Sequence, residues 1–225
     1  MDVRDRYNKV FAAGTTTERL VFFSDAVFAI AMTLLVIDLK VPIPGEQTTW
    51  QIIATQSDDL LAYALSFTII GLNWMGHHRK FRVIKYHDAP LMILDLVLLF
   101  FIAFLPFPTS LLSEYSGDDI AVVFYASVVG IVGMLQYAIW RYAWRKGFVD
   151  KVIDAPLYKY VRRNQLLTPI VFGVSIPLAL FISGDVAMYS WLALIPVHVG
   201  LRLWDARTPS APRTPPKTPA RRSPD

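Results

Sequence analysis

Long apolar runs separated by short polar segments form the pattern of this chain. Six runs each approach the roughly 20 residues that a helix needs to cross the hydrocarbon core of a bilayer. They cover Arg19–Val41, Leu60–His77, Pro90–Leu112, Ile120–Arg141, Leu166–Ser183 and Val186–Leu203. The pattern predicts an all-α membrane protein with six transmembrane helices. A soluble helical protein is disfavoured, because too little polar sequence remains to cover a soluble surface.

Composition agrees with this class. Of the 225 residues, 54% are apolar and only 18% are charged, whereas soluble domains average about a quarter charged. The chain has no cysteine, which excludes disulfides and thiolate metal sites. Its net charge of +4 does not indicate a nucleic-acid partner, since the basic residues fall in short clusters between the runs and form no continuous face.

Lys and Arg lie almost entirely on one side of the predicted membrane. Twenty-one of the 22 fall in the N-terminal segment, after the second run, after the fourth run or at the C-terminal end, and only Lys40 falls on the other side. Basic residues stay cytoplasmic, so we expect both termini in the cytoplasm. The opposite side is acidic, and Asp38 at the end of the first run is a candidate for a pore mouth that concentrates cations.

These signals divide the chain into three parts. Residues 1–17 are a cytoplasmic N-terminal segment, and residues 18–205 hold the six helices. Residues 206–225 contain six prolines and five basic residues. A segment of this composition cannot form a packed core, and we expect a disordered tail.

The first run places polar and apolar groups on different faces. On a helical wheel Leu34 and Ile37 lie within about 40° of Ile30, and Thr33 lies about 60° to one side. Asp25 lies about 140° from Ile30. If the apolar stripe faces a pore, Asp25 faces neighbouring helices of its own subunit; if Asp25 faces a pore, the stripe is ordinary packing.

Partners for Asp25 are available at the same depth. The second run ends in a polar, aromatic segment that contains Trp74, His77 and His78, and Arg19 lies nearer the cytoplasm at the level of the headgroups. Burying an unpaired Asp is costly. An imidazole that donates to Asp25 would hold the first two helices together and could make their contact sensitive to pH.

Several motifs resemble one known family. Arg19 followed after three residues by Phe23-Ser24-Asp25 matches the R-x-x-x-F-S-D signature of the transmembrane protein 175 family, which contains lysosomal and prokaryotic potassium-permeable channels. The chain is also similar to the family in the apolar positions after Asp25, in Trp74, His77, His78 and Phe81, and in the FLPFPT segment at Phe104–Thr109. The resemblance covers the six runs, and the proline-rich tail lies outside it.

The resemblance implies a homotetramer whose first helices line a central pore. By position, Ile30 would form the narrowest apolar ring with Leu34 and Ile37 beyond it, and Thr33 would contribute to a modest preference for potassium over sodium. The remaining signature residues would brace the pore helix: Arg19, Phe23, Ser24, Asp25, Trp74, His77 and His78. Because the wheel separates the two faces, we interpret Asp25 as a brace and not as an ion ligand.

Asp95 departs from the family pattern. It is an acid inside the third run, at MILDLVL. It could pair with a basic residue, stay protonated or bond to a neighbouring subunit. We favour a polar contact between helices.

The sequence therefore predicts a potassium-permeable leak channel, gated by an apolar constriction, in the plasma membrane of a prokaryote. Proton conduction is the first alternative. A secondary transporter is a weaker one, because no internal repeat is visible. An enzyme is not expected: the four histidines are scattered and no G-x-S-x-G motif occurs. We expect no cofactor and no metal site.

Overall fold

The computed structural model describes residues 17–39, 48–115 and 117–191, and within these ranges all regular elements are helical apart from one isolated β-bridge. In chain order they are α2 (Thr17–Leu34), the 3-10 turn η1 (Leu35–Asp38), α3 (Thr49–Thr55), α4 (Ser57–Phe81), α5 (Ala89–Phe104), α6 (Pro106–Glu114), α7 (Asp119–Arg145), α8 (Ala155–Phe181) and α9 (Gly184–Trp191). The predicted N-terminal segment, except its last residue, and the whole predicted tail lie outside the described residues.

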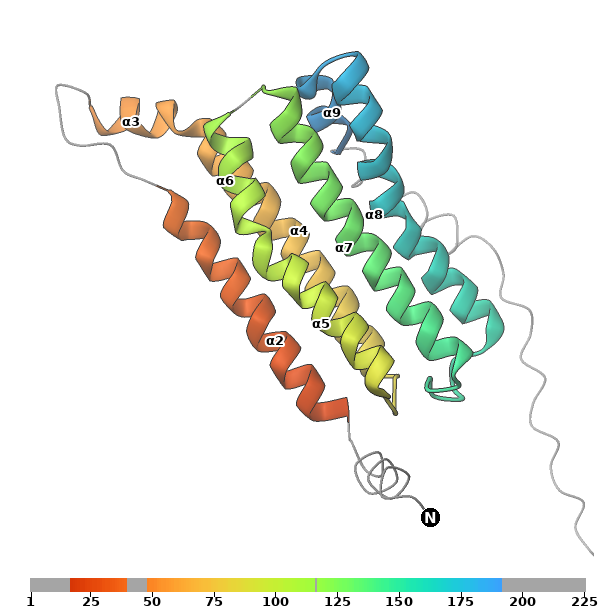
Figure 1. The fold of residues 1–225 in the computed structure, drawn as a ribbon. Helices are drawn as coiled ribbons and strands as arrows, with labels where there is room; N and C mark the ends of the chain where they lie inside the picture. The colour runs from red at the N-terminus through yellow and green to blue at the C-terminus, as the bar shows by residue number, and fades with distance from the viewer. Residues whose placement is uncertain (1–16, 40–47, 116, 192–225) are drawn as a thin grey trace, which may run out of the picture.

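The long helices run side by side in one bundle (Figure 1). α7 and α8 form an antiparallel hairpin, α5 and α6 follow one another along α7, and α9 packs on α7 and α8. α2 lies at one edge of the bundle, where it contacts α4 and α5. One of its faces is therefore left uncovered by the other described residues of the chain.

Among the described residues, four helical segments are long and apolar enough to cross a membrane: Thr17–Ile37, Ala89–Glu114, Asp119–Arg145 and Ala155–Phe181. The chain is thus an all-α, multi-pass membrane protein, as the sequence predicts. α4 has 25 residues, a length of about 37 Å, but polar residues near its end make it less apolar than the other four. The sixth predicted helix is described only to Trp191, and the rest of that run lies outside the described residues.

One predicted boundary is wrong by more than a few residues. The fifth helix begins at Ala155 and not at Leu166, because Asp154 caps it: its side chain accepts a hydrogen bond from the Leu157 amide at 2.9 Å. Pro156 in the first turn favours the same start. A search for apolar runs missed these turns because they are polar.

The third run is not one uninterrupted helix. α5 ends at Phe104 and α6 begins at Pro106. Pro106 and Pro108 have no amide hydrogen, so they cannot continue the hydrogen-bond ladder of the preceding turn. Thr109 restores it, since its amide donates to the Leu105 carbonyl at 3.1 Å.

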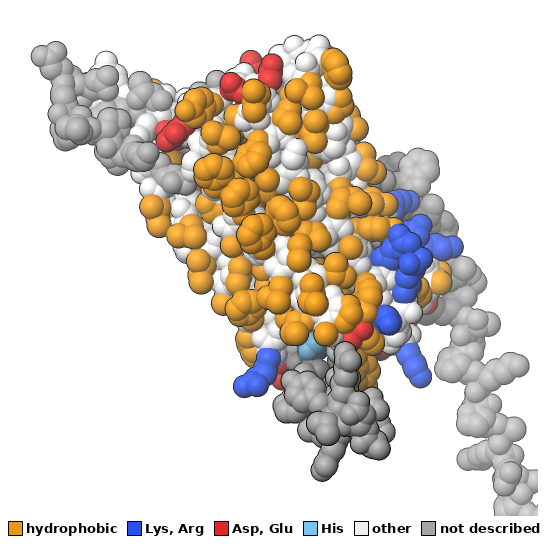
Figure 2. All heavy atoms as spheres, viewed as in Figure 1, with side chains coloured by type: hydrophobic (Ala, Val, Ile, Leu, Met, Phe, Trp, Pro, Cys, Tyr) orange, Lys and Arg blue, Asp and Glu red, His pale blue; other side chains and the backbone are white. Residues whose placement is uncertain are grey.

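The surface has the polarity of a membrane protein. An apolar band covers the middle of the bundle, Lys and Arg gather towards the end where α2 begins, and acidic side chains lie at the opposite end (Figure 2). The asymmetry matches the distribution of Lys and Arg along the sequence.

Candidate functional site

The first helix has two faces of different character. The side chains that it buries recur every three or four residues, which is the spacing of one helical face. They are Leu20, Ser24, Phe28 and Ala31 in α2 and Leu35 at the start of η1. Ser24 is the one polar group among them, and it is fully buried.

The opposite face carries the predicted pore residues. Ile30 is 57% exposed and Ile37 68% exposed, and Leu34 and Thr33 are also exposed. The Thr33 hydroxyl donates to the Ile30 carbonyl at 2.8 Å, which leaves its oxygen lone pairs free to face outward. In a membrane such a face meets either lipid or another copy of the chain.

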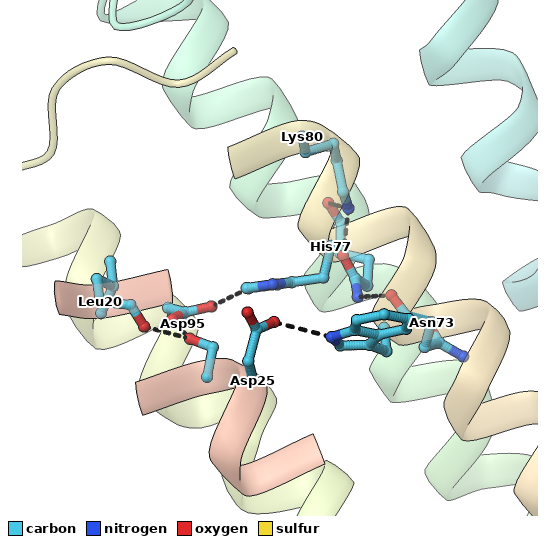
Figure 3. Close-up of polar contacts among 9 residues, drawn as sticks. Leu20, Asp25, Asn73, His77, Lys80 and Asp95 are labelled. Atoms are coloured by element: carbon cyan, nitrogen blue, oxygen red, sulfur yellow. Dashed lines mark hydrogen bonds and ion pairs between the residues drawn. The ribbon is translucent and has the colours of Figure 1, made fainter. Parts of the chain in front are cut away.

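Three buried polar residues from three helices form the inner cluster, made of Ser24, His77 and Asp95. The Ser24 hydroxyl oxygen lies 2.8 Å from Asp95 Oδ2, and His77 Nε2 lies 2.7 Å from Asp95 Oδ1. All three are inaccessible to solvent. Asp95 on α5 therefore joins α2 to α4, and Figure 3 shows it between the two helices.

Aromatic rings hold His77 in place. Its imidazole stacks on Phe81 with ring centroids 4.3 Å apart and lies 5.5 Å from the ring of Phe28 on α2. Its second nitrogen, Nδ1, is buried and has no hydrogen-bond partner among the described residues. The ring therefore makes one polar bond, to Asp95, inside an apolar cage.

Three further residues form the outer cluster, made of Asp25, Trp74 and His78. The Trp74 indole N–H donates to Asp25 Oδ1 at 2.8 Å, the bond drawn from Asp25 in Figure 3. His78 Nδ1 lies 3.7 Å from Asp25 Oδ2. The rings of Trp74 and His78 also lie 5.6 Å apart. The side chains of His78 and Asp25 are 40% and 30% exposed. This cluster joins α2 to α4 at the surface of the bundle.

A third polar contact ties α4 to α7. The Lys80 ammonium is buried and donates to the backbone carbonyl of Gln136 at 3.2 Å and to its side-chain oxygen. The Gln136 amide in turn donates to the Asn73 carbonyl at 3.2 Å. Lys80, which the sequence pattern places in a cytoplasmic loop, is thus a buried residue of a helix.

The structure changes the interpretation of the acids. The sequence pattern treats Asp25 as the buried carboxylate, whereas Asp25 is partly exposed and Asp95 is the buried one. Asp25 does meet a helix-two imidazole, that of His78, and His77 bonds to Asp95 instead. The sequence could have singled out Asp95, because it is the only ionisable residue of the third run, Pro90–Leu112.

Other predicted brace residues lie apart from both clusters. Arg19 is exposed and makes no hydrogen bond or ion pair with the residues that the structure describes. Phe23 is 52% exposed and shares the face of Ile30. Asp38 ends η1, but its side chain is outside the described set. Gln136, which the sequence interpretation did not use, contacts Lys80 on α4.

Comparison of the chain with known proteins identifies its family. A model of the endosomal/lysosomal potassium channel TMEM175 matches residues 19–106. A protein of Streptomyces collinus named as a potassium channel is 35% identical over 192 residues, which cover 80% of this chain and 93% of the relative. The chain belongs to the TMEM175 family. The family expected from the signature residues is confirmed.

Solved structures agree with this TMEM175 assignment. The fold is similar to the crystal structure of a protein from Chamaesiphon minutus, described as a lysosomal potassium-selective channel TMEM175 homolog. The TM-score is 0.70 at 28% identity, and the match covers 83% of this chain and 97% of the other. Nearly the whole subunit of that homolog therefore has a counterpart here.

Vertebrate TMEM175 proteins are more distant. The Danio rerio protein, named an endosomal/lysosomal proton channel, is 26% identical over 137 residues. The match covers 60% of this chain but only 26% of that protein. This chain is therefore similar to about a quarter of the vertebrate protein.

Proposed function

We propose that this chain is one subunit of a potassium-permeable leak channel in the plasma membrane of a prokaryote. Four copies surround a shared axis, and α2 of each copy lines the pore. Membership of the TMEM175 family supports this, as does the naming of its relatives as potassium channels. The observation that carries the proposal is the uncovered apolar face of α2. The opposite face of the same helix packs on α4 and α5 of its own subunit.

The polar clusters explain why this face has one orientation. The inner cluster fixes Ser24 towards α4 and α5, and the outer cluster fixes Asp25 towards α4. With both bonds made, α2 cannot rotate about its axis without breaking a buried hydrogen bond. Ile30 and its stripe therefore point away from the subunit, towards the place where other copies would meet.

An apolar ring at Ile30 supplies the gate. A constriction lined by aliphatic side chains expels water when it is too narrow for hydrated ions, and it then blocks current. Leu34 and Ile37 extend the constriction towards the acidic end, where Asp38 begins the pore mouth. Opening requires α2 helices to move apart at Ile30.

Thr33 provides the selectivity. Its hydroxyl oxygen keeps free lone pairs on the exposed face beside Ile30. Four such oxygens replace a small part of the hydration shell of a cation, so the preference for potassium over sodium is modest. Thr33→Ala is expected to lower this preference, measured as a shift of the reversal potential under bi-ionic conditions; an unaltered reversal potential removes Thr33 from the role.

Orientation follows from charge. The basic end of the bundle, where α2 begins, is cytoplasmic by the positive-inside rule. The N-terminus is then cytoplasmic, and an even number of spans returns the C-terminus to the same side. This also places both polar clusters in the cytoplasmic half of α2.

Flux through purified protein in liposomes tests the proposal. The wild type is expected to release potassium down its gradient, and Ile30→Asn is expected to raise the leak, since a polar ring stays hydrated. Ile93→Asn is the matched control: Ile93 lies on α5 and is 57% exposed, as is Ile30. Equal leak from the two variants, or from Ile30→Asn and the wild type, removes Ile30 from the gate.

Proton conduction is the second candidate, because the vertebrate relatives are named proton channels. The same liposomes, loaded with a pH-sensitive dye and free of potassium, separate the two. Acidification that follows an imposed pH gradient supports a proton pathway. Flux that saturates and requires a counter-ion favours the transporter alternative over both.

A further inference from the structure

The inner cluster contains more close oxygen contacts than its ordinary hydrogens can fill. The Ser24 hydroxyl oxygen lies 2.8 Å from the Leu20 carbonyl oxygen and also 2.8 Å from Asp95 Oδ2. Two oxygens at this separation need a hydrogen between them. A serine hydroxyl has one hydrogen, and a carbonyl has none. A separate hydrogen for each contact therefore requires one on Asp95.

His77 does not supply that hydrogen. Its Nε2 contacts the other carboxyl oxygen, Oδ1, at 2.7 Å, so a proton on Nε2 does not lie between Ser24 and Oδ2. A cationic His77 would also carry a hydrogen on Nδ1, which is buried without a partner among the described residues. A buried unpaired donor is costly. A neutral His77 with its proton on Nε2 leaves only a lone pair at Nδ1, and every hydrogen is then used.

The surrounding charges leave Asp95 without a direct counter-ion. On α4 the buried Lys80 bonds to Gln136 on α7, and no ion pair joins it to Asp95 within 4 Å in the described structure. On α2, Asp25 is turned to the outer cluster and Arg19 is exposed. α7 has no charged residue between positions 120 and 140, and α5 has no other ionisable group.

We infer that Asp95 is held as a neutral carboxylic acid and is the positioning residue of the pore helix. Its Oδ2–H donates to Ser24, Ser24 donates to the Leu20 carbonyl, and Oδ1 accepts from His77. Three helices are thereby joined without any net charge inside a bilayer, where a charged Asp is expensive. The part that concerns the pore rests on the proposed channel function; the proton assignment does not.

Infrared spectroscopy tests the proton directly. The wild-type protein at neutral pH is expected to show the carbonyl stretch of a protonated carboxylic acid. Asp95→Asn should abolish that band, and Asp25→Asn, the control in the partly exposed outer cluster, should leave it unchanged. A wild type without the band, or a band that survives in Asp95→Asn, overturns the assignment and favours an ionised pair with His77.

Conservative replacement tests the positioning role. An Asn at position 95 presents the same shape as a protonated acid, with an oxygen for His77 and an N–H donor for Ser24. Asp95→Asn is therefore expected to keep potassium flux within about twofold of the wild type. Asp95→Leu, which removes both bonds, should lower flux at least about tenfold, as expected from leaving buried polar groups unpaired.

The two arms fail in different ways. Loss of flux in Asp95→Asn to the level of Asp95→Leu overturns the positioning role, because the amide reproduces every bond of the neutral acid. If Asp95→Leu does not fold, Asp95→Asn and the infrared comparison still decide. If the channel proposal itself is wrong, the wild type conducts no ions, while the infrared result stands unaffected.

Discussion

The inner and outer clusters both attach α2 to the rest of the subunit through an aspartate side chain, but the surroundings of the two side chains differ. Asp95 is completely buried and bonds to two helices, whereas Asp25 is 30% exposed and bonds to one. The two attachments leave α2 from neighbouring positions, Ser24 and Asp25. Adjacent residues of one motif therefore lie in different surroundings: Ser24 is buried and Asp25 is partly exposed.

The physical difference lies in what replaces a lost bond. Water can solvate a group of the outer cluster when its partner is removed, so only the net value of a hydrogen bond is lost. The inner cluster is inaccessible to solvent among the described residues, so each group left behind bears its full desolvation cost. We therefore expect the inner cluster to dominate stability, although the outer cluster holds the signature acid.

Removing the two carboxyl groups should give the largest contrast in stability. Asp95→Ala leaves Ser24 and His77 without their bonds to this carboxyl group and should lower the free energy of unfolding by roughly 2–6 kcal/mol, at about 1–3 kcal/mol for each buried group. Asp25→Ala should cost only about 0.5–1.5 kcal/mol. The stability of both variants is measured in detergent, as the temperature at which half of the folded gel-filtration peak is lost. Equal midpoint temperatures for the two variants would contradict the distinction between the clusters.

The paired histidines should follow the same order with a smaller gap. His77→Ala removes the bond to Asp95 and the ring that stacks on Phe81, and it leaves a cavity, for a cost of about 3 kcal/mol. His78→Ala loses a long, half-exposed contact and should cost less than about 1 kcal/mol. A larger fall in the melting midpoint for His78→Ala would reverse the assignment.

A single hydrogen bond of the outer cluster is probed by Trp74→Phe. The phenyl ring keeps most of the packing against His78 but cannot donate to Asp25. The expected cost is about 1 kcal/mol, seen as a small drop in melting midpoint. In the Asp25→Ala background the same substitution should cost almost nothing further, and full additivity in this double-mutant cycle would argue against the bond.

Arg19 should have the smallest effect. It is exposed and lies apart from both clusters. Arg19→Gln is therefore expected to change the free energy of unfolding by less than about 0.5 kcal/mol, measured from the melting midpoint. A loss comparable to that of Asp25→Ala would show that Arg19 braces α2 within its own chain.

Much of the architecture was predictable because hydrophobic length is a local property. The apolar runs predict the spans, and the wheel of the first run separates Ile30 from Asp25 correctly. The start of α8 at Ala155 and the break before Pro106 were missed, since polar first turns and paired prolines are not visible to a count of apolar residues.

The composition of the candidate site was less predictable. Sequence proximity groups Ser24 with Asp25 and His77 with His78, yet the structure separates each pair between two clusters. A helix turns by about 100° per residue, so neighbours in sequence face different helices. Asp95 and Gln136 enter from α5 and α7, and only packing shows which face of α2 and α4 they meet.

The amino-acid sequence by itself determined that the chain crosses a membrane several times, which end is basic, and that the first helix has an apolar stripe away from its acid. These follow from hydrophobic length, charge count and helical period. Only the tertiary structure decided which carboxylate is buried, because burial depends on the helices that surround a residue. The same packing places Asp95, and not Asp25, beside the Ser24 hydroxyl, where the inferred proton of the carboxylic acid lies.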